Sequence, residues 1–368
     1  MKIIENKYYN LALKWAPVDY QYIQLDDASP YLNNTDTYPD GKGIEFFNLK
    51  QDLLCQVDFA LSDKDPDRWN TKEVKRRLEN AIFVDLIPTV YYSIAETEQH
   101  FFILYSFYHA YDRDHPNDME GCLIILAKKG NEECLLGMIT IAHYDFWYYT
   151  YKKNLTVKKG ITTSGQVEID EEFDGQGHPL IQQEDRKHGL YALGTHIAWF
   201  TKLWWWILRI FNKSPDIVVY YPPITKASQY SFENLIKGKK SPYNPSFYYA
   251  LVDILDKENG LWERWNNKEQ RIADCTFDEF GKFYGGAANP PWLWKPADAK
   301  SLLESFLTRI KKTLHLKIKK YESTEITEIW KDPQKLASDH FIHGEGMAEF
   351  NSKYLRHMDG SLPAKNQQ

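Results

Sequence analysis

The chain has few of the features that mark several common protein classes. Its 368 residues include only four cysteines, and no two of them form a Cys-x-x-Cys pair. That spacing excludes a zinc ribbon and a thioredoxin-type motif, and it fits reduced thiols in a cytoplasmic protein. No run of about 18 apolar residues is present, so the sequence predicts no membrane-spanning helix.

Basic charge and familiar catalytic motifs are also lacking. The net charge is −6 at pH 7, whereas a nucleic-acid-binding protein usually presents a basic face, so we expect no nucleic-acid partner. The sequence contains no G-x-S-x-G elbow, P-loop, G-x-G-x-x-G turn or H-E-x-x-H helix, which disfavours the hydrolases, nucleotidases, dehydrogenases and zincins that carry them. The N-terminal residues lack the apolar segment of a secretory signal. We therefore expect the protein to be cytoplasmic as synthesised, and any export or injection to need no signal peptide.

Aromatic residues, in contrast, are abundant, at 15% of the chain with 25 Tyr and 12 Trp. Short runs rich in Ile, Val, Leu, Tyr and Phe alternate with charged or Gly/Pro/Asn turns, as strands do. The sequence thus predicts a mainly β protein, an antiparallel β-sandwich with inserted and C-terminal helices. The expected strands cover residues 18–23, 53–60, 82–93, 100–109, 120–127, 133–149, 180–183 and 216–221.

Three helices are expected, at residues 71–79, 195–213 and 299–316. The remainder of residues 1–45 is predicted to form loops around the first strand. We expect residues 1–316 to form a single β-sandwich domain with a helical insertion near 195–213. Residues 317–368 are polar and are predicted to be a loose C-terminal extension.

The helix at residues 195–213 is unusually rich in Trp and Phe, and its cations share one narrow stripe. Packed against the sandwich, it is a core helix or a partner surface. Otherwise it lies in a membrane surface with its cations facing the head groups. The side chains that would make this peripheral contact are Trp199, Trp204, Trp205 and Trp206.

The most informative stretch is an acidic turn between two apolar strands. Asp118 and Glu120 are two residues apart at the start of a strand, so their side chains project to the same face. The preceding turn can fold Asp112 and His115 over that face. Carboxylates brought this close repel each other unless a proton or a cation lies between them. The pattern indicates a hard divalent ion, Ca²⁺ or Mg²⁺ or else Mn²⁺, although solvated residues of a hairpin turn would show the same composition.

The same residues carry a family resemblance. The run His-Pro-Asn-Asp-Met-Glu at residues 115–120 resembles the G-H-R-H-D-W-E heptapeptide of the necrosis- and ethylene-inducing-peptide-like cytolysins. It is also similar to the H-x-G-D-W-E signature of a vacuolar-protein-sorting-associated family. Uncharacterised microbial proteins of that broad type are closer still, and they resemble residues 91–121, 177–191 and 285–294 in the same order.

The resemblance implies a metal site and a binding function. The cytolysins' ligands in the heptapeptide correspond to His115, Asp118 and Glu120, Asp112 is the nearest candidate for their further Asp ligand, and His188 resembles their histidine beside the metal. Their ion helps to bind sphingolipid sugar heads before membrane damage. The chain departs from the pattern at Met119, which replaces Trp.

Three hypotheses remain open. The first is a toxin-like or effector-like protein that binds a sugar or lipid head group through a divalent ion. The second is a metal-dependent hydrolase with His188 as the catalytic acid or base. The third is a structural or interaction protein that is only stabilised by its ion.

Overall fold

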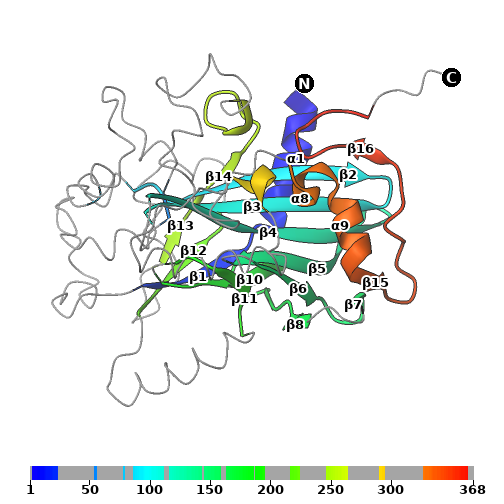
Figure 1. Cartoon of the computed structure of the whole chain (residues 1–368), viewed down its shortest axis with the longest axis horizontal. Helices are drawn as coiled ribbons and strands as arrows, with labels where there is room; N and C mark the ends of the chain where they lie inside the picture. Colours follow the sequence, from blue (N-terminus) through cyan, green and yellow to red (C-terminus); the bar gives the residue numbers. More distant parts are fainter. Residues whose placement is uncertain are drawn as a thin grey trace, which may run out of the picture.

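The computed structural model of the chain describes residues 2–23, 54–55, 78, 86–111, 116–142, 145–158, 163–185, 187–194, 216–223, 246–263, 290–294 and 326–363. The predicted mainly β architecture is confirmed: two sheets face each other, and short helices accompany them (Figure 1). The larger sheet has eight strands, β14 (Ala250–Asp253), β2 (Thr89–Thr97), β3 (His100–Tyr111), β4 (Pro116–Lys129), β5 (Glu132–Ala142), β6 (Asp145–Thr150) and β8 (Thr163–Gln166) in that order, with β16 (Tyr354–Arg356) beside β2.

The smaller sheet has six strands and is completed by segments that are distant in the sequence. Its order is β11 (Leu190–Ala192), β10 (His178–Gln183), β1 (Val18–Ile23), β12 (Asp216–Tyr221) and β13 (Ser246–Tyr248), with β9 (Ile169–Asp170) beside β10. A separate two-stranded sheet pairs β7 (Leu155–Val157) with β15 (Phe341–His343). The strands β1 and β12 have the bounds that the sequence predicts.

The sheets are mixed rather than purely antiparallel. The central hairpin strands β2 to β6 pair antiparallel, as expected. Four pairs are parallel: β1 with β10, β12 with β13, β14 with β2, and β6 with β8. Parallel neighbours require a crossover connection, which a reading of local turn signals does not reveal.

The core strands are buried on both faces. Every residue of β2 and of β3 is buried, which explains why β3 reads as a near-continuous apolar and aromatic run. The inner face of the larger sheet packs against the smaller sheet. It also contacts helix α1 (Lys2–Lys14), where the Tyr105 hydroxyl donates to the Ala12 carbonyl at 2.7 Å.

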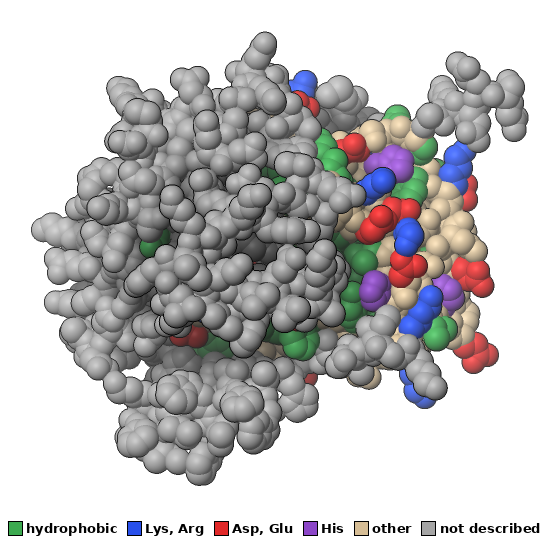
Figure 2. Space-filling model, in the orientation of Figure 1, with side chains coloured by type: hydrophobic (Ala, Val, Ile, Leu, Met, Phe, Trp, Pro, Cys, Tyr) green, Lys and Arg blue, Asp and Glu red, His purple; other side chains and the backbone are tan. Residues whose placement is uncertain are grey.

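The outer face of the larger sheet is covered by late segments of the chain. The short helix η5 (Pro291–Leu293) brings Trp294 against β4, and the Trp294 indole Nε1 donates to the Met119 carbonyl at 3.0 Å. Helices α8 (Glu328–Lys331) and α9 (Pro333–His340) follow, and Trp330 joins Trp262 and Trp292 in one aromatic cluster. The described part of the surface in Figure 2 mixes acidic, basic and histidine side chains, with no patch of one charge.

Three local predictions are wrong. Residues 2–14 form helix α1, where loops were expected; its Lys and Asn residues make it only weakly amphipathic, but Leu11 and Ala12 are buried. Residues 326–363 are not a loose tail: β16 pairs with β2, and the Met358 carbonyl accepts a hydrogen bond from the Ser93 hydroxyl. The run 133–149 is two strands, β5 and β6, rather than one.

Several predicted elements lie outside the described residues. They are the helices at 195–213 and 299–316, all of the 53–60 strand except residues 54–55, and all of the 71–79 helix except Leu78. The Trp side chains 199 and 204–206, proposed for membrane contact, lie in the first of these.

Candidate functional site

Strand β4 carries the two predicted carboxylates into the interior. Asp118 and Glu120 are 1% and 2% exposed, and the alternation of side chains along a strand places both on the inner face. In the antiparallel register, His109 of β3 lies directly opposite Asp118. The β3–β4 hairpin thus directs one imidazole and two carboxylates toward the smaller sheet.

His188 approaches the same carboxylate from the smaller sheet. It lies in the turn between β10 and β11, and its backbone has a positive φ of 55°, an uncommon conformation for a residue other than glycine. Its ring is fully buried, and Nδ1 is 2.7 Å from Asp118 Oδ2. The strained turn therefore places a histidine in an ion-pair geometry that bridges the two sheets.

A chain of hydrogen bonds fixes the tautomers of the two histidines. The His188 carbonyl can only accept, so the Gln183 Nε2 donates to it at 2.9 Å. The Gln183 Oε1 must then accept from His109 Nε2, 3.1 Å away. Asp118 likewise requires the proton on His188 Nδ1. In their neutral forms, His109 carries its lone pair on Nδ1 and His188 on Nε2.

The two imidazoles also limit each other's charge. Their rings are stacked, with centroids 3.8 Å apart and planes 7° apart. Two imidazolium ions at this distance would repel each other in a region shielded from water. A neutral imidazole with an oriented lone pair is the form that binds metal ions.

Glu120, two residues further along β4, extends the cluster toward β11. Burial raises the pKa of the Tyr191 hydroxyl well above its usual range, and the nearby Glu184 and Glu120 carboxylates raise it further. Tyr191 is on β11, at the edge of the smaller sheet. Glu120 of the larger sheet therefore lies close enough to Tyr191 of the smaller sheet to disfavour its ionisation.

Of the predicted site residues, the structure brings together Asp118, Glu120 and His188. Asp112 and His115 come between β3 and β4 in the sequence and are outside the described residues. Within the described part of the chain, no set of three His, Cys, Asp or Glu side chains is arranged to hold a metal ion. The two inward carboxylates have the donor chemistry of such a site, and the remaining donors would have to come from the turn.

Sequence reasoning missed His109 and Gln183. A signal for His109 was present, because an antiparallel hairpin around residues 112–115 places it opposite Asp118. Gln183 has no such signal: its role depends on the pairing of β10 with β1, which joins distant parts of the chain.

The polar cluster is separate from the pocket found near the β4–β5 turn. That pocket has a volume of about 330 Å³ and is lined by Trp15, Lys129, Cys134 and Tyr151, among others. It lies at the opposite end of β4 from Asp118. The cluster of Asp118, Glu120, His109 and His188 is therefore not part of this pocket, and it is buried between the two sheets.

Comparisons with known protein families, with curated proteins and with solved structures find no match for this chain. Among the described residues, no helix has the length and apolar character needed to cross a membrane.

Proposed function

We propose that this chain is a divalent-cation-binding β-sandwich protein whose ion orients a sugar or lipid head group. Asp118 and Glu120 would hold the ion, together with Asp112 and His115 from the β3–β4 turn. The ion supplies a positive centre that attracts hydroxyl or phosphate oxygens. The family resemblance of residues 115–120 points to the same chemistry.

The observation that carries this proposal is the burial of Asp118 and Glu120 on one face of β4. Moving a carboxylate out of water is costly, and two on neighbouring positions also repel each other. With His188 in its neutral form, Asp118 and Glu120 carry two negative charges. One divalent ion balances both charges without requiring a proton on either acid.

The position of His188 favours binding over hydrolysis. A catalytic acid or base exchanges a proton with the substrate, but the Nδ1 proton of His188 is held by Asp118. Carboxylates that bind metal ions are commonly held in place by a hydrogen bond from a second group, and His188 is placed to supply it to Asp118. We therefore assign His188 to positioning Asp118 rather than to acid–base catalysis.

The test is calorimetric titration of the metal-stripped protein with Ca²⁺, Mg²⁺ and Mn²⁺. We expect one ion to bind near the β3–β4 turn, and Asp118→Asn and Glu120→Gln each to weaken binding at least about tenfold. Glu132→Gln is the matched control, because Glu132 is exposed at the far end of the β4–β5 hairpin. Equal affinity in Glu120→Gln and Glu132→Gln would refute the site.

The head-group step has its own test. Phosphatidylcholine vesicles with and without a glycosylated sphingolipid are floated with the protein in Ca²⁺ or in chelator. We expect flotation only with the glycolipid and only when Ca²⁺ is present. Ion binding that raises the melting temperature without any such flotation would favour a purely stabilising ion.

A further inference from the structure

Asp19 is a buried acid that the proposed divalent site does not use. It lies on β1 and is 0% exposed, and neither carboxylate oxygen has a hydrogen-bond partner among the described residues. Its neighbours in register are Ile181 on β10 and Tyr220 on β12. An ionised carboxylate in this setting is strongly disfavoured unless a proton or a cation accompanies it.

The described groups near Asp19 include His188, whose Nδ1 is held by Asp118, and the Tyr249 hydroxyl, which cannot donate to Asp19. Each tyrosine has one hydroxyl hydrogen, and that of Tyr249 is donated to the Pro17 carbonyl at 2.8 Å. Burial raises the pKa of Tyr249 well above its usual range, and the nearby Cys122 and Asp19 raise it further. Tyr249 therefore presents lone pairs, rather than a proton, in the region around Asp19.

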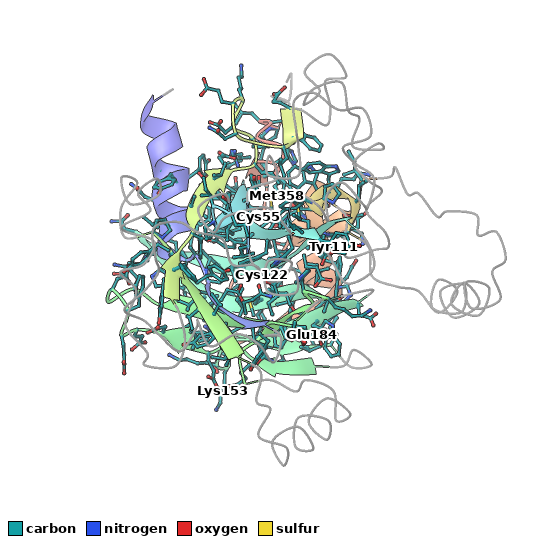
Figure 3. The ribbon with its side chains drawn as sticks, turned by 90° about the vertical axis from the view of Figure 1, so that its left-hand side faces the viewer. Cys55, Tyr111, Cys122, Lys153, Glu184 and Met358 are labelled. Carbon is teal, nitrogen blue, oxygen red and sulfur yellow. The ribbon has the colours of Figure 1, made fainter. Side chains whose placement is uncertain are left out.

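The thiol of Cys122 is another group near Asp19, and it lies at the centre of the molecule between the sheets (Figure 3). Burial raises its pKa well above the usual range, and the negative charge of Asp19 adds to that effect. A thiol is only a weak donor. It cannot replace the strong hydrogen bonds that a carboxylate loses on leaving water.

A further acceptor lies on the same face of β1. Gln21, two residues from Asp19, is fully buried, and its Oε1 has no hydrogen-bond partner within the described part of the chain. Its Nε2 donates to the carbonyls of Glu184 and Tyr22, at 3.3 and 3.4 Å. Among the described residues, Tyr249 and Gln21 thus present oxygen acceptors rather than donors toward Asp19.

We propose that Asp19 binds a monovalent alkali cation, sodium or potassium, between the two sheets, with Tyr249 Oη and Gln21 Oε1 as the neutral oxygens available to it. One carboxylate and neutral oxygens carry a single negative charge, which a monovalent ion cancels. A divalent ion would leave a net positive charge in the dry interior. Its ligands differ from those of the site at Asp118 and Glu120, but the two sites are neighbours, because His188, which is held by Asp118, also acts electrostatically on Asp19.

The experiment compares melting temperatures in NaCl, KCl and choline chloride at equal ionic strength, with chelator present to remove divalent ions. We expect the wild type to melt several degrees higher in one of the alkali salts than in choline chloride. Asp19→Asn, which keeps the shape and removes the charge, should abolish that difference. Asp118→Asn and Asp339→Asn, the latter an exposed acid, should retain it.

Two results would overturn the proposal: no difference between alkali salts and choline in the wild type, or the same difference in Asp19→Asn. A loss of the effect in Asp118→Asn but not in Asp19→Asn would place the cation elsewhere and refute it as well. An infrared measurement compares the wild type with Asp19→Asn, so that only the band of the Asp19 carboxylic acid is followed. A protonated Asp19 at neutral pH, seen in choline chloride and abolished by the alkali salt, supports the site; its persistence in both salts refutes it.

Discussion

Gly121, which follows Glu120 on β4, should tolerate no side chain. A Cβ built at this position would lie 2.0 Å from the Tyr105 carbonyl oxygen and 2.6 Å from Trp294 Cη2. Real Cβ contacts essentially never fall below 3.0 Å, so the backbone of β3 would have to move by about 1 Å. Overpacking costs about 1–3 kcal/mol, and a backbone obstacle in the central hairpin places Gly121→Ala near the upper end, at about 3 kcal/mol.

The assay is chemical and thermal unfolding of Gly121→Ala beside the wild type. A loss of about 3 kcal/mol corresponds to a fall in Tm of roughly 5 °C or more for a chain of this size. Gly177→Ala is the matched control, since its Cβ would meet only Ile169 Cδ1 at an ordinary 3.4 Å. Shortening Trp294 to Leu should not rescue Gly121→Ala, because the nearest atom belongs to the backbone. A Gly121→Ala protein as stable as Gly177→Ala would refute this account of the hairpin.

Three further predictions concern buried charge. Burial opposes ionisation of Glu96, but hydrogen bonds from Lys128, Tyr8 and Lys7 outweigh it and lower the pKa of Glu96. Glu96→Gln should therefore lower the free energy of unfolding by about 2 kcal/mol at neutral pH. In urea unfolding, the difference in stability between the two proteins should shrink as the pH falls below 4.5, because the wild type then also loses the charge on Glu96. Burial lowers the pKa of His100 to about 4, so the wild type should lose stability between pH 6.5 and 4, where only the unfolded state gains a proton. The urea midpoint of His100→Phe should not fall in this way over the same pH range. The same fall in midpoint with pH in both proteins would contradict the prediction. His188→Asn, whose side chain tolerates the positive φ, should keep the fold by circular dichroism but weaken divalent-ion binding by about 10–100-fold, and unchanged affinity would remove His188 from the site.

The sequence predicted the elements whose evidence is local. The runs that form β3, β4 and β5 are long and dense in β-branched and aromatic residues, so their existence follows from composition and turn signals. The shared orientation of Asp118 and Glu120 follows from strand geometry alone, and their burial confirms that both point inward.

The rest of the fold and of the candidate site could not be predicted from local sequence signals. His188 meets Asp118 only because β10 pairs with β1 and the two sheets then pack together. The burial of Asp19 has the same origin, because its strand gains both neighbours from distant parts of the chain. Helix α1 escaped prediction because its stability comes from packing against the sheet, where the Tyr8 hydroxyl and Lys7 reach Glu96.

The central place of β1 in the smaller sheet has a consequence for biogenesis. This strand is synthesised before the hairpin strands of the larger sheet, yet its partners β10 and β12 are synthesised only after them. Until then its apolar and aromatic side chains have no surface to cover them, and such long-range pairing forms slowly. Nascent chains that stop after β6 should therefore hold a nearly complete central hairpin and an unprotected N-terminal strand, which makes that interval the one in which a chaperone would be needed.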